Sequence, residues 1–295
     1  MDLSLTRRNL LRTSALATAG SLLTNHASAQ SATEAGPSLE GRIFKAVKGG
    51  RKRSESPLQF FQRLKNLGFD GVESGNAAEA DAYFAATKET GLMFHGMVCG
   101  WHWGTRFSSP DEATRAKALA NLERDLRNTQ RLGGSSILLV PGKVSGAKET
   151  HDDVWNRSLT EVKKVLPLAS RLGVHILIET VWNGFCESPE KLRDYVDAFE
   201  SPWVGAYFDI GNMQKFAPAE EWIRTLGHRT IKLDIKDWGK KNGFCRLGEG
   251  DVDWDKVRIA LKETGFSGWA TREGRDKSLE DTSALIDQLL IGKKG

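Results

Sequence analysis

The sequence of 295 residues is poor in cysteine, with only three, and none of them lies in a CxxC pair. An odd number of cysteines cannot all be paired, so we expect no disulfide framework. A basic stripe is also missing, because the lysines and arginines behind the net charge of +4 are spread among acids. A nucleic-acid partner is therefore not expected. The three cysteines are Cys99, Cys186 and Cys245.

Long apolar runs are lacking as well, except near the N-terminus, so no other segment approaches the ~20 residues that span a bilayer. Arg7 and Arg8 precede an uncharged stretch that ends in Ala-Ser-Ala at 27–29. This pattern predicts a cleaved export signal over residues 1–29, and the paired arginines resemble a twin-arginine signal. A general secretory signal with coincidental arginines is the alternative. We expect a periplasmic mature protein, with a flexible segment over 30–40 and no membrane partner.

From about Gly41 onwards, short β-like runs alternate with amphipathic helical stretches. The runs predict strands at 43–48, 71–74, 92–98, 136–141, 174–179, 204–209, 230–235 and 268–273. The stretches predict helices at about 57–67, 77–90, 110–132, 151–172, 189–199, 219–226, 253–264 and 278–290. Eight alternations favour one α/β domain over 41–291, a (β/α)8 TIM barrel. A doubly wound open sheet is the alternative, but no GxGxxG follows the first strand and no composition break divides the chain.

Acidic residues stand at the carboxyl ends of four predicted strands: Glu73, Glu179, Asp209 and Glu273. Such strand ends meet at one mouth of a barrel, where the chemistry of this fold takes place. Any one of these acids, taken alone, could be a solvated surface residue. Gathered together, they would repel one another unless cations lay among them. A cluster of oxygen ligands suits a divalent ion such as Mg²⁺, Mn²⁺ or Co²⁺.

The seventh predicted strand, TIKLDIKD at 230–237, alternates apolar and charged residues. Three apolar residues are expected to pack under the surrounding helices: Ile231, Leu233 and Ile235. On the opposite face, Asp234 and Lys236 are expected to point at the active site. Lys232 shares their parity nearer the barrel floor, where we expect it to form an ion pair.

Five motifs carry a resemblance to a known family: ILIET, YFDIGN, KLDIKDW, RLGEGDVDW and WATRE. Together they resemble the xylose isomerase-like TIM-barrel superfamily, and more narrowly its sugar phosphate isomerase/epimerase group, which has tagatose epimerases and hydroxypyruvate isomerases as relatives. The resemblance spans the chain after its first 40 residues. It implies a divalent metal ion held by Glu179, Asp209, Asp234 and Glu273. The third position departs from the family, because Asp234 stands where the motif usually has histidine. Asn212 likewise occupies a place that is often histidine.

The resemblance also implies a reaction, in which a proton moves between adjacent carbons of a sugar through an enediolate. The metal ion would stabilise the developing oxyanion. Glu179 and Glu273 would remove and return the proton. Lys236 and Arg272 could either neutralise the acids or polarise a substrate oxygen, and Lys236 is the better catalytic candidate because of its inward parity.

Six further residues are predicted to contact the substrate: His95, Trp101, His102, Asn212, Arg246 and Glu249. Aromatic rings combined with imidazoles suit a polyol, because they supply both stacking surfaces and hydrogen bonds. Arg246 and Glu249 lie in a segment that resembles the loop closing over this family's substrates. The partner expected from these residues is a small carbohydrate, and a homo-oligomer is compatible with the sequence.

We therefore expect a metal-dependent isomerase or epimerase acting on an unphosphorylated sugar or keto-sugar, because export separates the protein from phosphorylated metabolites. A lyase or hydratase that acts on 3-keto-glycosides by β-elimination is the main alternative, since the same base and metal ion would serve it. An endonuclease IV-like phosphodiesterase is disfavoured, because the chain has only six histidines and no basic face. A non-catalytic sugar-binding barrel would follow if Asp234 had abolished metal-dependent chemistry.

Overall fold

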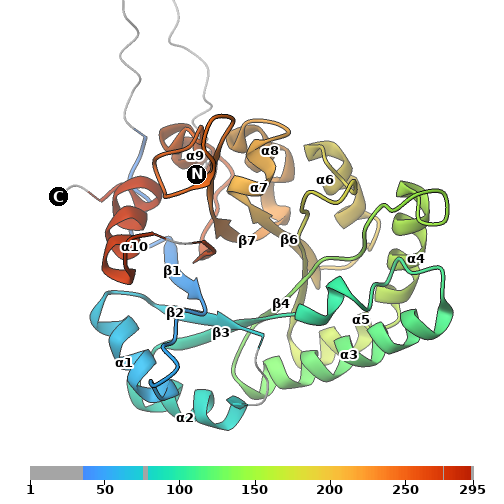
Figure 1. Cartoon of the computed structure of the whole chain (residues 1–295), viewed down its shortest axis with the longest axis horizontal. Coiled ribbons are helices and arrows are strands. Elements are labelled where there is room, and N and C mark those ends of the chain that lie inside the picture. The colour runs from blue at the N-terminus through green and yellow to red at the C-terminus, as the bar shows by residue number, and fades with distance from the viewer. Residues whose placement is uncertain (1–35, 76–78, 275, 294–295) are drawn as a thin grey trace, which may run out of the picture. The chain divides into compact units, whose positions relative to one another are not determined.

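The computed structural model describes residues 36–75, 79–274 and 276–293. They form a closed barrel of parallel strands with helices around it, in the strand order β1-β10-β7-β6-β5-β4-β3-β2 (Figure 1). The predicted (β/α)8 TIM barrel is therefore confirmed. Within the described part of the chain, no helix is both long enough and apolar enough to cross a membrane. The predicted export signal lies outside the described residues.

All eight barrel strands lie close to their predicted ranges, because each is a short run of buried, β-favouring residues that ends near a turn. They are β1 (Ile43–Lys48), β2 (Gly71–Ser74), β3 (Met93–Val98), β4 (Ser136–Leu139), β5 (His175–Ile178), β6 (Val204–Asp209), β7 (Thr230–Ile235) and β10 (Gly268–Arg272). A separate antiparallel hairpin, β8 (Asp237–Gly239) with β9 (Gly243–Cys245), follows β7 and was not predicted. Its sequence signal is Asn242-Gly243, a dipeptide typical of hairpin turns.

Apart from one short helix at Ile210–Gln214 that was not predicted, the helices follow the predicted alternation. They are α1 (Pro57–Asn66), α2 (Ala80–Thr90), α3 (Glu112–Arg131), α4 (His151–Lys163), α5 (Leu166–Leu172), α6 (Pro189–Asp197), α7 (Ile210–Gln214), α8 (Ala219–Leu226), α9 (Trp254–Glu263) and α10 (Leu279–Leu285). The helix predicted over 151–172 is divided into α4 and α5. Pro167 lies in the first turn of α5, and because proline has no backbone N–H, it favours the start of a new helix.

Residues 36–40 belong to the segment that was expected to be flexible. Within this part, Leu39 is fully buried and its N–H donates to the carbonyl of Ile291 at 2.7 Å. The N–H of Gly36 donates to Oδ1 of Asp255 in α9 at 2.8 Å. These contacts tie the described part of the segment to the helical layer.

Strand β7 contains an irregularity that changes one expected side-chain direction. Ala206 of β6 is paired with Thr230, but the next residue of β6, Tyr207, is paired with Lys232. Ile231 is therefore an extra residue on β7, as in a β-bulge. Its side chain packs inside the barrel with the cluster that contains Tyr207, so the prediction that Ile231 lies under the helices is wrong. Leu233 and Ile235 do pack in the main core, as predicted.

Below the strand ends, the barrel interior is filled by a hydrogen-bonded layer. The hydroxyl of Tyr207 hydrogen-bonds with Glu73 Oε2 at 3.0 Å and with Thr271 Oγ1 at 2.9 Å. Glu73, expected as a strand-end acid at the mouth, is fully buried in this layer. Lys232 Nζ donates to the carbonyl oxygen of His95 at 2.7 Å and lies 2.7 Å from Nδ1 of the same residue. Hydrogen bonds to His95 thus replace the ion pair expected for Lys232.

Gly96 lies against this layer, and we predict that replacing it with alanine destabilises the barrel. A Cβ atom there would come within 2.7 Å of Glu73 Oε1 and 3.0 Å of Lys232 Nζ. Overpacking of this kind costs about 1–3 kcal/mol of unfolding free energy, which urea denaturation can measure. Gly100→Ala is the control, because nothing lies within 4 Å of the added Cβ atom. Equal losses for the two variants would contradict the steric explanation.

Candidate active site

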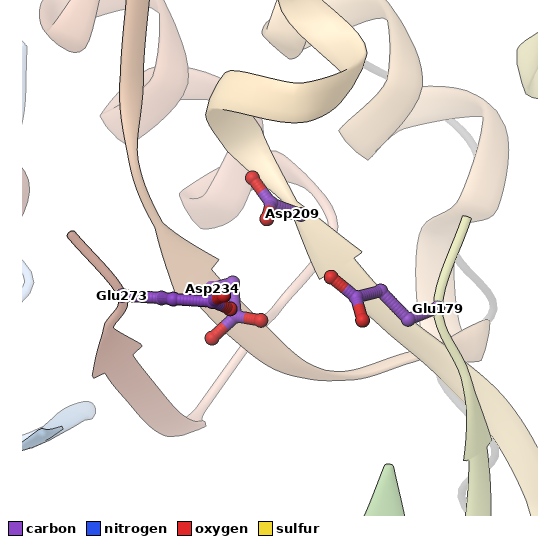
Figure 2. A group of neighbouring side chains, drawn as sticks. All are labelled: Glu179, Asp209, Asp234 and Glu273. Carbon is purple, nitrogen blue, oxygen red and sulfur yellow. The ribbon is translucent and has the colours of Figure 1, made fainter. Parts of the chain in front are cut away.

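Four carboxylates meet at the carboxyl ends of neighbouring barrel strands (Figure 2). Glu179 follows β5, Asp209 ends β6, Asp234 lies in β7 and Glu273 follows β10. Each can offer an oxygen that lies within 4.8 Å of those offered by the other three. Three of the side chains are buried, whereas that of Glu273 is 40% exposed. Glu273 is therefore the member of this carboxylate cluster most open to a substrate.

The backbone positions these acids directly. Asp209 and Asp234 are register partners on the neighbouring strands β6 and β7, so their side chains emerge side by side. Asp209 also caps α7, because its Oδ1 accepts the N–H of Asn212 at 2.8 Å. The side-chain amide of Asn212 in turn donates to Glu179 Oε1 at 3.4 Å. Sheet register and a helix cap thus hold three of these residues in place.

Two lysines lie among the four acids. Lys236 Nζ is 2.8 Å from Asp209 Oδ2 and 3.4 Å from Glu273 Oε1, in line with its predicted inward direction. Lys48 Nζ pairs with Asp234 and lies 2.8 Å from Glu273 Oε2. Sequence reasoning missed Lys48. The available signal was its place at the end of the first strand, where other strands carry the acids.

The two glutamates of the cluster, Glu179 and Glu273, differ in the direction in which their pKa is shifted. Burial, aided by the charge of Asp209 and opposed by Lys48, raises the pKa of Glu179 to about 8. Burial also disfavours the charged form of Glu273, but Lys48 and Lys236 outweigh it and lower its pKa to about 2. Burial likewise raises the pKa of both aspartates, Asp209 and Asp234. The two ammonium groups therefore do not fully compensate the charge of the cluster.

The donor set fits a hard divalent cation. All four donors are carboxylate oxygens, which Mg²⁺ and Mn²⁺ prefer. Asp234 Oδ1 is buried and has no hydrogen-bond partner. Asp209 Oδ2 has none in hydrogen-bond geometry either, although Lys236 Nζ lies 2.8 Å away. If all four carboxylates are ionised, they exceed the two lysines by two negative charges, which one divalent ion would balance.

A cavity of about 530 Å³ opens beside the carboxylate cluster. Its lining includes Asn212, Lys236, Phe244, Arg246 and Glu273. This volume is within the usual range for small-molecule sites, about 300–1,000 Å³. The hairpin of β8 and β9 supplies part of the wall, because Phe244 lies in β9.

The aromatic surface at this wall comes from Phe244, which sequence reasoning did not assign to the site. Phe244 is 52% exposed and stacks on Trp182, with ring centroids 4.9 Å apart. Lys236 Nζ lies 5.8 Å from the centroid of the Phe244 ring. A half-exposed aromatic face thus stands next to the charged groups of the cavity, an arrangement suited to a polyol.

The arginines that line the cavity are held by acids. Arg246 makes two hydrogen bonds to Asp281, at 2.9 Å and 2.6 Å. Arg272 makes two to Asp276, at 2.8 Å and 2.9 Å. Arg272 therefore neutralises Asp276 and not the acids of the carboxylate cluster for which it was considered.

The two histidines predicted to contact the substrate do not line this cavity. His95 stacks on Trp269 at 4.4 Å in the layer below the acids, and burial lowers its pKa well below the usual value. Nδ1 of His102 accepts the N–H of Val140 at 3.1 Å, and burial lowers its pKa to about 4. Packing and backbone hydrogen bonding account for both neutral side chains.

Trp101 and Glu249 do not line the cavity either. The indole N–H of Trp101 donates to Asp125 of α3 at 2.6 Å, which gives this tryptophan a role in packing. Glu249 is exposed, and its Oε1 lies 3.6 Å from Nη1 of Arg246. Of the six predicted substrate contacts, the structure brings Asn212 and Arg246 to the cavity.

Comparisons with known proteins agree on one architecture. The model of the family described as xylose isomerase-like TIM barrel matches residues 61–290. An L-ribulose-5-phosphate 3-epimerase from Escherichia coli O1:K1 is 26% identical over 247 residues, covering 78% of this chain and 86% of that protein.

Two solved structures share the fold. The 3-keto-D-glucoside 4-epimerase from E. coli has a TM-score of 0.71 at 19% identity and covers 84% of this chain and 97% of its own. A D-psicose 3-epimerase from Clostridium cellulolyticum H10, solved with D-tagatose, has a TM-score of 0.69 at 19% identity. It covers 83% of this chain and 99% of its own.

Proposed function

Because this chain belongs to the xylose isomerase-like TIM-barrel family, we propose that it is an isomerase or epimerase of an unphosphorylated sugar or keto-sugar. The observation that carries the proposal is the position of two glutamates. Glu179 and Glu273 approach the centre of the carboxylate cluster from opposite sides (Figure 2). Proton removal on one face of a carbon and return on the other requires two such groups.

The position of each residue in the site indicates its role in the proposed reaction. Glu273, the exposed member of the cluster, reaches the cavity and takes the proton from the carbon next to the sugar carbonyl. Glu179 returns a proton from the other side, and Asn212 orients its carboxylate. Lys236 lines the cavity and supplies positive charge where the enediolate oxygen develops. A divalent ion held by the four carboxylates would add Lewis-acid stabilisation of that oxygen.

The pairing of the cavity's cations favours a substrate without a phosphate. Among the described lining residues, each basic side chain is already bound to an acid: Lys236 to Asp209, Arg246 to Asp281 and Arg272 to Asp276. A phosphate would have to compete with these carboxylates for its charge-assisted hydrogen bonds. Twin-arginine export to the periplasm, which we also propose, would separate the protein from phosphorylated sugars.

Solvent exchange tests the proposal. The purified protein is mixed in D₂O with free ketoses, with their phosphate esters and with 3-keto-glycosides, and the products are followed by NMR. We expect deuterium in an epimer or isomer of a free sugar, and slower turnover of the phosphate ester. Release of an aglycone from the 3-keto-glycosides would instead support a lyase, and an absence of exchange with every substrate would contradict both functions.

Substitution of Phe244 tests whether the aromatic wall of the cavity binds the substrate. We predict that Phe244→Ala raises KM by roughly two- to tenfold with little change in kcat, because it removes about 0.5–1.5 kcal/mol of aromatic contact. Steady-state kinetics on the sugar that exchanges deuterium measures both constants. Phe84→Ala, at an exposed phenylalanine of α2, is the control and should leave KM unchanged. A fall in kcat alone would contradict a binding role for Phe244.

A further inference from the structure

The proposed reaction assigns no role to Lys48, although this residue lies among acids of the carboxylate cluster. Its side chain is only 13% exposed, and its Nζ pairs with Asp234 and lies 2.8 Å from Glu273 Oε2. Glu73 Oε2 lies 4.0 Å away on another side. The ring of Tyr207 completes the surroundings, with its centroid 4.8 Å from Nζ. Three acids and an aromatic face thus form a cation site, and the chain's own ammonium group fills it.

This site overlaps the one that a divalent ion would use. Asp234 and Glu273 are two of the four carboxylates that could hold a metal ion. Asp234 offers one oxygen to the cluster, and its Oδ1 is buried and has no hydrogen-bond partner, so the residue retains an oxygen for a second cation. An ion bound there would share the charge of Asp234 and Glu273 with Lys48 and would be repelled by its ammonium group.

We propose that Lys48 is a tethered cation that competes with a divalent metal ion for Asp234 and Glu273, and so weakens metal binding at the carboxylate cluster. In the metal-free protein, the same ammonium group holds these two acids together. The inference concerns metal affinity and does not depend on which sugar reaction the protein catalyses.

The variant Lys48→Met tests this competition. Methionine is neutral, nearly as long as lysine and able to pack on Tyr207. Mn²⁺ is titrated into the full-length wild-type and variant proteins after chelator treatment, with binding followed by calorimetry and by the EPR signal of free Mn²⁺. We expect the variant to bind Mn²⁺ at least about tenfold more tightly than the wild type. Equal or weaker binding by the variant overturns the proposal, and so does a lack of binding by both proteins.

Lys45→Met is the matched control. Lys45 lies on the same strand and is also buried, but its Nζ pairs with Asp287 at 2.8 Å and Ser283 Oγ at 2.7 Å, both in the helical layer. Its loss removes the same charge without touching the carboxylate cluster, so Mn²⁺ affinity should stay at the wild-type value. An equal gain in both variants would point to overall charge and overturn the proposal.

Folding of the variant can be separated from metal binding. If Lys48→Met fails to fold without a metal ion, Mn²⁺ present during refolding should restore the native circular dichroism spectrum, because the ion takes over the role of the ammonium group. Lys48→Gln is a second neutral variant with a shorter side chain. If Mn²⁺ restores the fold of neither Lys48→Met nor Lys48→Gln, the proposal is overturned. Deuterium exchange on the sugar is measured separately, so a failure of the proposed reaction leaves the comparison of Mn²⁺ affinities intact.

Discussion

Replacing Glu179 with glutamine should lower kcat for formation of the deuterated epimer by about 10²–10⁴-fold, the usual contribution of a positioned acid or base. Glutamine has nearly the same shape but cannot take up or release a proton at this position. Because burial already disfavours the ionised form of Glu179, removing its charge should cost little folding stability. NMR of the exchanging sugar and a thermal melt of the same sample give the two readouts.

The control for this substitution is Glu123→Gln, at an exposed position on α3. It should leave both exchange and melting unchanged. Glu273→Gln should lower kcat by a similar factor, and the double variant should be little worse than either single one, because the two carboxylates act in one proton-transfer sequence. Epimer formation at the wild-type rate in Glu179→Gln would contradict the assignment of Glu179.

The second large effect is expected on stability, from Asp276→Ala. Arg272 and Asp276 form an ion pair with side chains 3% and 0% exposed. Without Asp276, the guanidinium would keep its buried position without its counter-charge, which costs about 3–5 kcal/mol of unfolding free energy. The melting temperature should fall by roughly 6–20 °C. Chemical denaturation and calorimetry measure the two quantities.

Loss of this ion pair should also disturb the active site, because the same guanidinium holds the backbone there. Arg272 Nη1 donates to the carbonyl oxygen of Glu273 at 2.6 Å and to that of Ile235 at 2.9 Å. Asp194→Ala is the control. Asp194 pairs with Arg193 at the surface, with a side chain 58% exposed, and such pairs contribute about 0–1 kcal/mol. Similar losses in the two variants would contradict the importance of burial at Asp276.

The sequence by itself determined the fold, and family membership agrees with the resemblance inferred from its motifs. Apolar runs with helical caps between them are local signals, and their eightfold alternation leaves few ways to close a sheet. The strand ends of a parallel barrel share one mouth, which placed Glu179, Asp209 and Glu273 together, and the resemblance to the family completed the set of four with Asp234. The same strand-end argument also placed Glu73 at the mouth, whereas this residue is fully buried in the layer below. The roles of the set of four as metal ligands and proton carriers remain predictions.

What only the tertiary structure decided is which partner each charged or aromatic side chain takes. Alternation along β7 could not reveal the bulge at Ile231, which depends on the register with β6. Lys48 and Asp234 are 186 positions apart in the chain, yet they pair inside the barrel. Arg272 forms an ion pair with Asp276, and His95 forms a hydrogen bond with Lys232. Secondary structure follows from short-range periodicity, whereas contacts across the barrel depend on closure of the sheet, which no local pattern encodes.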